Sequence, residues 1–342
     1  MNRPKTLLIV GSVRLPRIDA GASRILELCQ GFKAHFDKII IAAKSDDEPH
    51  KIYSYDEKIS FLPYHKNNAS SFWDRINITF FIHKFFIKDL MSCLEENNVT
   101  HILIYSALPI LAVKKIKRIA RKNNTKLIYD VVEFQTLSKQ TFASFLSFYL
   151  PNIYLNKKGI KKSDKVISIS SYLKKYFDSR GCYSVRIPFV FDTRNVEFYK
   201  EKSEDKNTLN LLYAGHPKKG KDILYKCIEG LALLPDDVKN RINFNITGTS
   251  AENLLKNGKL SKDVYNKTKE MVHYLGKQTN EKIKELYSQS DFSVLIRDKN
   301  NRLSQAGFPT KVSESLAHGV PMICNITSDL GEYLINDFNA II

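Results

Sequence analysis

The sequence has few of the features that mark secreted, metal-binding or membrane-spanning proteins. Its five cysteines are scattered, with no Cys-x-x-Cys pair and no histidine at metal-binding spacing. We therefore expect reduced thiols, a cytoplasmic location and no structural metal. The first apolar run, Leu7 to Val10, is shorter than the apolar region of a signal peptide. No run approaches the roughly 18 apolar residues of a spanning helix, so we expect no transmembrane segment.

Acidic residues are also in short supply. The chain has 36 Asp and Glu against 53 Lys and Arg, which gives a net charge of +17. A field of that sign attracts polyanions, whether nucleic acid, an anionic membrane surface or a diphosphate-containing substrate. Composition alone does not choose among these three partners. The 342 residues, 43% hydrophobic and 26% charged, fit a globular protein of two domains.

Strand patterns and helix patterns alternate along both halves of the chain. The segment Lys5–Gly11 has the apolar pattern of a buried strand, and helical spacing follows over Ala22–Phe36. Further strands are predicted at 38–43, 59–63, 101–106, 126–130, 164–168, 209–215, 241–247, 271–275 and 291–296. This alternation is typical of parallel α/β sheets, so we predict an α/β protein with two Rossmann-like domains.

The stretch from Arg297 to Leu330 is the most informative part of the sequence. A strand ends before it, and a glycine turn at Gly307 leads into a helix that starts at Pro309 and ends at Gly319. The free N–H groups and the dipole at the start of this helix favour a phosphate, which Gly307 lets the backbone approach. The helix should have an apolar face with Val312 and Leu316 and an opposite face with Lys311 and Ser315.

Glu314 lies one turn into this helix. A carboxylate there would repel a phosphate, unless it accepts hydrogen bonds from sugar hydroxyls beside that phosphate. We therefore predict that Glu314 binds the ribose of a nucleotide.

The same segment resembles the donor-binding segment of glycosyltransferase family 4. The matching runs are Gly307-Phe308-Pro309-Thr310-Lys311-Val312, Glu314-Ser315-Leu316-Ala317 and Gly319-Val320-Pro321. The resemblance implies a retaining, nucleotide-sugar-dependent enzyme with the two-domain GT-B fold, and the first run is similar to that of an exopolysaccharide or capsule-type branch. Family members carry two glutamates eight positions apart. Glu314 matches the second, a ribose ligand, and Ala306 stands where the first would contact the donor sugar.

The resemblance also implies roles for residues outside the helix. Lys219, in a Lys-Gly pair after the strand 209–215, is expected to contact the donor diphosphate, and the alternative is a surface lysine. Gly276 is expected to line the base pocket, unless it only makes a turn. Arg297 is placed to bind a donor phosphate or a sugar hydroxyl. The segment Gly307–Thr310 is expected to hold the β-phosphate, without a cofactor or a metal.

The N-terminal half offers three candidate residues for the acceptor. Gly21 stands where a glycine often faces the cleft of GT-B enzymes, so it is either substrate-facing or part of a plain connection. Asp130 and Glu133 follow a strand, at the edge where open α/β sheets bind ligands. They either grip acceptor hydroxyls as catalytic residues or cap the loop through local hydrogen bonds.

Aromatic and basic residues gather in two predicted helical segments. Phe72–Leu94 is rich in aromatics with interspersed basic residues, and the apolar stretch Thr141–Tyr154 is followed directly by lysines. Each is either an amphipathic face that rests on an anionic bilayer or a buried helix. The basic residues of a third helix, Ile110–Lys122, are interpreted as a solvated face.

We therefore predict an N-terminal acceptor domain over 1–191, a linker over 192–207 and a C-terminal nucleotide-sugar domain over 208–342, with the domains facing a cleft. Family members continue with helices that cross back onto the first domain, so we expect those helices to be missing and the chain to be truncated.

The predicted function is metal-independent, retaining transfer of a sugar from a nucleotide-diphosphate sugar to a lipid-linked or saccharide acceptor. It would serve surface polysaccharide biosynthesis, peripheral to the inner face of the cell membrane. One alternative is a non-catalytic nucleotide-sugar-binding scaffold. The other is a basic nucleic-acid-binding protein, although no recognised nucleic-acid motif is present and we expect no nucleic-acid partner.

Overall fold

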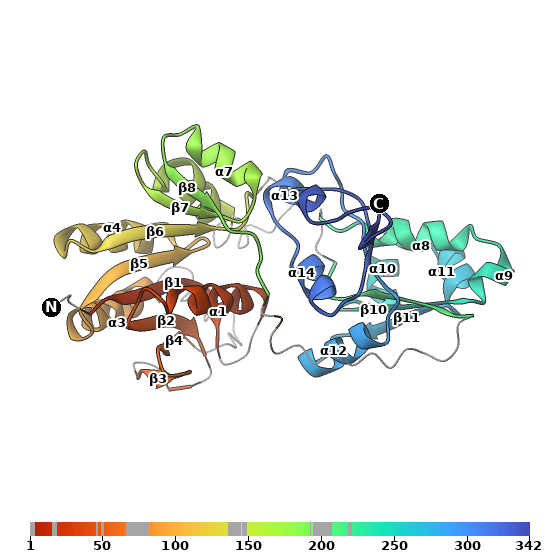
Figure 1. The fold of residues 1–342 in the computed structure, drawn as a ribbon, viewed down its shortest axis with the longest axis horizontal. Coiled ribbons are helices and arrows are strands. Elements are labelled where there is room, and N and C mark those ends of the chain that lie inside the picture. Colours follow the sequence, from red (N-terminus) through yellow and green to blue (C-terminus); the bar gives the residue numbers. More distant parts are fainter. Residues whose placement is uncertain are drawn as a thin grey trace. The chain divides into compact units, whose positions relative to one another are not determined.

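The chain contains two α/β units, each built on one sheet (Figure 1). The computed structural model describes residues 4–15, 19–45, 47–48, 51–65, 82–135, 145, 149–191, 193, 207–217 and 221–342. Contacts between residues divide the chain into unit 1, Met1–Val190, and unit 2, Phe191–Ile342. The predicted α/β class with two parallel-sheet, Rossmann-like domains is confirmed.

Unit 1 contains an eight-stranded sheet in the order β3-β4-β2-β1-β5-β6-β7-β8. Its strands are β1 (Thr6–Arg14), β2 (Lys38–Lys44), β3 (Tyr53–Ser54), β4 (Ile59–His65), β5 (Val99–Tyr105), β6 (Lys126–Val131), β7 (Lys165–Ser168) and β8 (Tyr183–Arg186). Its helices are α1 (Ala20–Phe32), α3 (Ile82–Glu96), α4 (Ile110–Lys122), α6 (Leu150–Tyr154), the π-helix η2 (Leu155–Gly159) that continues α6, and α7 (Ser171–Asp178). Every paired strand is parallel except β3, which runs antiparallel to β4.

The central strands of unit 1 are apolar because both faces of the sheet are covered. Leu7 and Ile9 of β1 are buried, and β1 pairs in register with β2, where Leu7 lies opposite Ile39. Such strands read as continuous apolar runs rather than alternating ones. On one face, α1 begins at Ala20 because the Asp19 carboxylate accepts hydrogen bonds from the first free backbone N–H groups.

Unit 2 contains a six-stranded parallel sheet in the order β11-β10-β9-β12-β13-β14. Its strands are β9 (Leu209–Tyr213), β10 (Ile242–Thr247), β11 (Val272–Gly276), β12 (Phe292–Leu295), β13 (Met322–Cys324) and β14 (Ala340–Ile341). Its helices are α8 (Leu224–Ala232), α9 (Asp236–Lys239), α10 (Ala251–Lys256), α11 (Lys262–Thr268), α12 (Asn280–Ser288), α13 (Arg302–Ala306), α14 (Thr310–Ala317) and the 3-10 turn η3 (Leu330–Glu332).

The helix that the sequence predicts after Gly307 is present. Helix α14 begins at Thr310 with Pro309 as its cap, and Gly319 follows it with a φ of +68°. The helix end expected at Gly319 is thus confirmed to within two residues, and the glycine adopts the left-handed conformation common after a helix. One part of the prediction was wrong, because the face opposite Val312 is buried as well. Ser315 is fully buried there, and its hydroxyl donates a hydrogen bond to the Val320 carbonyl at 2.8 Å.

Several boundaries differ from the predicted ones. Helix Ile110–Lys122 agrees residue for residue, whereas the short strand β3 and the short helix α13 were not predicted. After residue 328 the chain forms only the 3-10 turn η3 and the short strand β14. The segment 72–81 of the first aromatic helix, most of 141–148 and most of the linker 192–207 lie outside the described residues.

Candidate functional site

The sheet of unit 2 reverses its strand order beside β9. Strand β9 lies between β10, which follows it in the chain, and β12, which comes later. The carboxyl ends of β9 and β12 lead to Gly215 and to Arg297, respectively. Because ligands of open α/β sheets bind where the strand order reverses, this edge is the candidate functional site.

Asp222 joins three segments at this edge. Its Oδ2 accepts hydrogen bonds from the Tyr213 hydroxyl at 2.7 Å and from the Lys311 ammonium at 2.5 Å. Its Oδ1 lies 3.4 Å from Nε of Arg297. Lys311 also donates to the Tyr213 hydroxyl at 2.7 Å. This buried cluster, formed by Tyr213, Asp222, Arg297 and Lys311, therefore ties the ends of β9 and β12 to the first turn of α14.

Backbone pairing supports the same junction. Asp222 and Arg297 form an isolated antiparallel bridge, and the Ile223 amide donates to the Ile296 carbonyl at 2.9 Å. The Arg297 amide donates to the side chain of Asn325 at 2.9 Å. The sequence predicted that Arg297 binds a donor phosphate or a sugar hydroxyl, but its side chain is only 3% exposed and belongs to the buried cluster. Any effect of its charge on a ligand therefore acts from beneath the surface.

The charges of the cluster do not balance. Burial by itself would raise the pKa of Asp222, but the Lys311 ammonium, the Tyr213 hydroxyl and Arg297 hold that pKa below its ordinary value. Asp222 is therefore ionised at neutral pH. One carboxylate faces one ammonium and one guanidinium, so these three groups have an excess of one positive charge. Burial lowers the pKa of Lys311, and the charges of Asp222 and Glu314 act in the opposite direction. Such an excess at a strand edge attracts an anion.

Helix α14 adds a positive dipole end at the same edge. No side chain caps its start, and its first turn contains no acidic residue. Gly307 has a φ of −99°, which any residue adopts, so its conformation does not require glycine. Phe308 is 8% exposed and packs edge-on against Tyr333, at 5.4 Å between ring centres. Phe308 therefore supports the turn from inside, and the predicted phosphate contact of the segment Gly307–Thr310 is left to its backbone.

Glu314 lies on the next turn of the same helix. Its side chain is half-buried, and no hydrogen bond reaches its carboxylate from the described part of the chain. Burial raises the pKa of Glu314, while Lys311 acts in the opposite direction. Burial raises the pKa of the Tyr287 hydroxyl, and the Glu314 carboxylate raises it further. A half-buried carboxylate without a donor has its acceptor sites free for the hydroxyl groups of a ligand.

Three glycine turns form the neighbouring part of the edge. The Gly248 amide donates to the Gly276 carbonyl at 2.6 Å, and Gly248 has a φ of +75°. A Cβ on Gly248 would lie 2.6 Å from the carbonyl carbon of Gly215. Gly276 has a φ of +64° with open space where a Cβ would be. Gly276 therefore makes a turn that favours glycine. Its place in a base pocket stays a prediction.

Three members of the cluster, Tyr213, Asp222 and Lys311, were not predicted as site residues, and one predicted cation is not described. Lys219 lies outside the described residues. Asp222 was not singled out, and Lys311 was assigned only to a polar helix face. A signal for Lys311 was present, because a lysine in the first turn opposes the helix dipole and is unfavourable without an anionic partner. Nothing in the sequence indicated that the partner is Asp222, 89 positions earlier.

The predicted acceptor residues of unit 1 have other contacts. Asp130 is fully buried, and both of its oxygens accept hydrogen bonds from Arg24, at 2.8 and 2.9 Å. The carboxylate is thus a structural partner of α1, which neither of the two sequence alternatives described. Glu133 is half-buried and accepts a hydrogen bond from Gln135 at 2.6 Å. It remains a candidate for contact with a ligand.

Gly21 lies in the first turn of α1 rather than in a loop. Its amide donates to the Asp19 carboxylate at 3.1 Å. A Cβ at this position would lie 3.1 Å from the Tyr105 hydroxyl. The glycine therefore allows α1 to pack closely on the end of β5, and its predicted contact with substrate stays a prediction.

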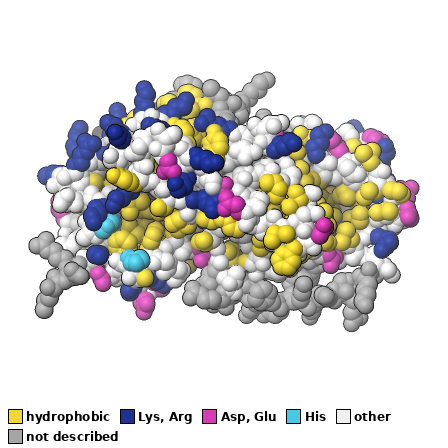
Figure 2. All heavy atoms as spheres, turned by 45° about the horizontal axis from the view of Figure 1, so that its top comes forward, with side chains coloured by type: hydrophobic (Ala, Val, Ile, Leu, Met, Phe, Trp, Pro, Cys, Tyr) yellow, Lys and Arg dark blue, Asp and Glu magenta, His cyan; other side chains and the backbone are white. Residues whose placement is uncertain are grey.

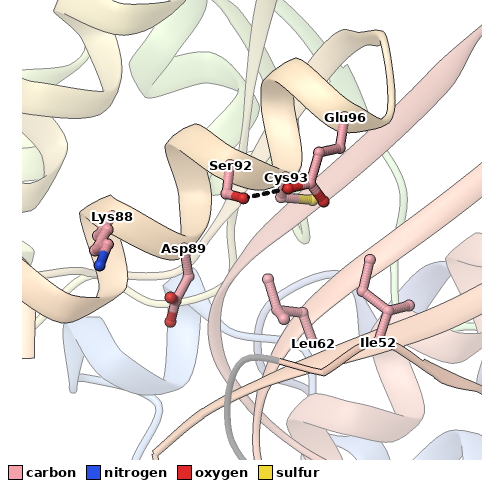
Figure 3. Close-up of a pocket in the computed structure, with 7 residues that line it drawn as sticks. All are labelled: Ile52, Leu62, Lys88, Asp89, Ser92, Cys93 and Glu96. Carbon is pink, nitrogen blue, oxygen red and sulfur yellow. Dashed lines mark hydrogen bonds between the residues drawn. The ribbon is translucent and has the colours of Figure 1, made fainter.

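Unit 1 also contains a cavity of about 380 Å3 between α3 and β4 (Figure 3). One face of α3 supplies most of its polar lining, and Leu62 supplies part of its floor. The Ser92 hydroxyl donates to the Glu96 carboxylate at 2.5 Å, and burial raises the pKa of the adjacent Cys93 thiol to about 11. The thiol is therefore protonated and unreactive at neutral pH. None of the predicted site residues lines this cavity.

Comparisons with known proteins agree with the fold. Residues 193–342 match the family model for glycosyl transferases group 1. No curated protein matches the chain. Among the described residues, no helix combines the length and the apolar character needed to cross a membrane.

Solved structures resemble the whole chain at low sequence identity. Sucrose-phosphate synthase from Thermosynechococcus elongatus has a TM-score of 0.67 and 12% identity, over 98% of this chain and 85% of that one. WaaG, a glycosyltransferase involved in lipopolysaccharide biosynthesis, has a TM-score of 0.60 and 12% identity, over 96% and 83%. HepE of Anabaena in complex with UDP-glucose has a TM-score of 0.59 and 12% identity, over 97% and 83%. The family match over residues 193–342 supports a glycosyltransferase, and the solved structures support the GT-B fold.

Proposed function

We propose that the protein is a retaining glycosyltransferase that moves a sugar from a nucleotide-diphosphate sugar to a saccharide acceptor, which is lipid-linked, in surface polysaccharide biosynthesis. The observation that carries this proposal is a pairing on one helix. The start of α14, with the positive buried cluster beneath it, suits a phosphate. One turn on, Glu314 holds a half-buried carboxylate with free acceptor sites, which suits the ribose hydroxyls.

The donor would lie across the carboxyl edge of the unit 2 sheet. Glu314 accepts hydrogen bonds from the ribose, and the backbone of Gly307–Thr310 faces the β-phosphate. Lys219 would add a direct cation to the diphosphate, and Gly276 would border the base. HepE has been solved with UDP and with UDP-glucose, so these two compounds are the first ligands to test.

Catalysis would rest on stabilising the departing nucleoside diphosphate. Negative charge develops on the diphosphate as the bond to the sugar breaks. The α14 dipole and the excess charge of the cluster that contains Lys311 and Arg297 are fixed in place before the reaction, which makes electrostatic stabilisation effective. We propose that these groups suffice without a metal ion. The acceptor hydroxyl would attack from the face that the diphosphate leaves and give its proton to the departing phosphate oxygen, so the configuration is retained.

The acceptor would bind to unit 1, with Glu133 and Gly21 as its candidate contacts. Asp130 takes a positioning role in this proposal, because Arg24 already occupies both of its oxygens. We place the protein on the inner face of the cell membrane, where a lipid-linked acceptor is accessible.

A non-catalytic nucleotide-sugar-binding protein is the second candidate. It is favoured by Ala306, which is fully buried at the end of α13, at the position where family 4 enzymes carry a glutamate against the donor sugar. A scaffold of this kind would bind the nucleotide sugar without hydrolysing it or transferring the sugar.

Thermal unfolding in the presence of nucleoside diphosphates and nucleotide sugars tests the proposal. A ligand that binds only the folded state raises the unfolding midpoint. We expect at least one nucleotide sugar to do so, and Glu314→Ala and Lys219→Ala to abolish the shift. The matched controls, Glu285→Ala and Lys284→Ala on the exposed face of α12, should leave it unchanged. A shift that survives Glu314→Ala would contradict the ribose role, and binding without any donor hydrolysis or transfer would favour the scaffold.

A further inference from the structure

Positive charge is concentrated in one part of unit 1. Residues 110–186 contain 17 Lys and Arg against 4 Asp and Glu, a net charge of +13, whereas all other residues together have a net charge of +4. Figure 2 shows Lys and Arg side chains gathered over unit 1. This concentration lies outside the donor site of unit 2, so binding of a nucleotide sugar does not account for it.

Helix α4 presents most of this charge on one stripe. Its inner face is buried and consists of Ala112, Val113, Ile116, Ile119 and Ala120. Its outer face is exposed and carries Lys114, Lys115, Arg118, Arg121 and Lys122. No carboxylate of the described chain forms an ion pair with any of these five cations. The exposed face of a solvated helix usually carries acidic residues between its basic ones, whereas the exposed face of α4 carries these basic residues without acidic neighbours.

The π-helix η2 holds a second group of cations beside α4. Lys117 of α4 donates to the Gly159 carbonyl at the end of η2 at 2.5 Å and lies 3.3 Å from Asp164. The guanidinium of Arg180 donates to main-chain carbonyls of the same turn, including that of Lys157 at 2.9 Å. Lys157 and Lys158 are exposed next to these anchors. The two basic elements therefore form one surface whose backbone is fixed.

Two exposed leucines lie on the same surface. Leu111 is 60% exposed and precedes Lys114 by one turn of α4, and Leu150 is 36% exposed and precedes Tyr154 by one turn of α6. The Lys114 ammonium lies 5.8 Å from the centre of the Tyr154 ring, which brings the two turns together. A partner for this surface must therefore accept apolar side chains as well as cations.

We propose that this surface, the α4–η2 face made by the outer stripe of α4 with Leu111, Leu150, Lys157 and Lys158, binds an anionic lipid bilayer. Lipid phosphates meet the lysines and arginines, and the leucines enter the region between headgroups and acyl chains. A single-stranded nucleic acid would need exposed aromatic rings for base stacking. The described ring beside this face, Tyr154, is only half-exposed and has the Lys114 ammonium 5.8 Å from its centre.

This inference deepens the proposed function by naming the surface that brings unit 1 to a lipid-linked acceptor, and it does not depend on donor binding. Loss of donor binding with retained bilayer binding would refute the proposed function alone. Retained donor binding with no bilayer binding would refute the α4–η2 face alone.

Cosedimentation of the full chain with lipid vesicles tests the proposal. Vesicles of phosphatidylcholine mixed with phosphatidylglycerol should retain the protein, vesicles of phosphatidylcholine alone should not, and added salt should weaken the binding. The test variant replaces Lys115, Arg118, Arg121 and Lys122 by glutamine, which has a similar helix propensity. Each basic residue near an anionic surface contributes about fivefold to partitioning, so we expect a loss of at least about a hundredfold.

The matched control removes the same number of charges from unit 2. It replaces the exposed Lys262, Lys267, Lys269 and Lys284 by glutamine, which gives the same net charge as the test variant. This control should bind vesicles as the unchanged protein does. Equal losses in the two variants would show that only bulk charge matters and would overturn the proposal.

Hydrogen exchange supplies a readout of position. Peptides from α4 and η2 should gain protection on anionic vesicles, and those from α11 should not. Thermal unfolding checks that each variant is folded, and a second variant with Lys157→Gln and Lys158→Gln tests the face without altering α4. Absence of vesicle binding by the unchanged protein would overturn the proposal. Tight retention of RNA or DNA that the α4 variant alone loses, with no vesicle binding, would assign the surface to nucleic acid instead.

Discussion

Replacing Asp222 by asparagine tests how much the buried cluster contributes to the stability of unit 2. The change keeps the shape of the side chain but removes the charge that faces Lys311 and Arg297. Because Asp222 is only 8% exposed, both cations would be left without a counter-charge away from water. Removing one partner of a buried ion pair costs about 3–5 kcal/mol. Asparagine retains one acceptor oxygen for Tyr213 or Lys311, so we expect about 3 kcal/mol.

A second substitution separates charge from packing. Lys311→Met by itself would leave Asp222 with Arg297 as its remaining cation and should also be destabilising. In the double variant, Asp222→Asn with Lys311→Met, one negative and one positive charge are removed together, so neither partner of this ion pair is left buried without a counter-charge. We therefore expect the double variant to be more stable than the sum of the single effects predicts, by about 1–3 kcal/mol.

Urea unfolding followed by circular dichroism measures these free energies, and hydrogen exchange of β9 and β12 amides assigns the change to unit 2. The control is Asp236→Asn, which removes an acid whose side chain is 91% exposed beside Lys239. It should leave the unfolding midpoint almost unchanged. A cost below about 1 kcal/mol for Asp222→Asn, or strictly additive single effects, would refute the electrostatic account of the cluster.

Other substitutions test single features. Because burial raises the pKa of Glu314, stability from this group is present at acid pH and is lost as pH rises through its folded-state value. The thermal midpoint of Glu314→Gln should therefore decrease less between acid and neutral pH than that of the unchanged protein. An equal decrease in the two proteins would contradict this. Gly258→Ala should lower the free energy of unfolding by the ~1–2 kcal/mol of left-handed strain alone, because a Cβ there meets open space. Gly248→Ala should lower it by well over that amount, because a Cβ there meets the backbone of Gly215. Equal thermal midpoints for the two variants would contradict the packing. Arg24→Lys should cost about 2–4 kcal/mol in urea unfolding by breaking the paired bonds to Asp130, and a neutral result would contradict their role.

The local elements of this fold were readable from the sequence because they depend on neighbouring residues. The apolar run of β1, the helix Ile110–Lys122 and the left-handed turn at Gly319 follow from side-chain periodicity and from the conformational freedom of glycine. Short elements such as β3 and α13 carry too few residues to show a period, so they were not predicted. Ser315 was assigned to the face opposite Val312 because a serine hydroxyl usually faces water. Its burial depends on a hydrogen bond to the Val320 carbonyl, which lies beyond the helix and cannot be identified from the helix pattern.

The candidate site was readable only in part. Glu314 and the start of α14 lie within one short segment, and that segment carries its own signals of turn, helix and charge. The hydrogen-bond partners of Lys311 and of Asp130 could not be predicted from the sequence. Lys311 meets Asp222 across 89 positions and Asp130 meets Arg24 across 106, and in each case the pairing depends on which strands are neighbours in the sheet.

The sequence by itself determined where most strands, turns and helices form, how much positive charge the chain carries and where helix α14 starts. Tertiary structure alone decided which charges are buried together and which remain exposed. The physical reason is that local conformation is set by propensity and periodicity over a few residues. The fate of a charge depends instead on the segments that the order of the sheet brings against it, which here turned Asp130 and Arg297 inward and left the outer stripe of α4 in solvent.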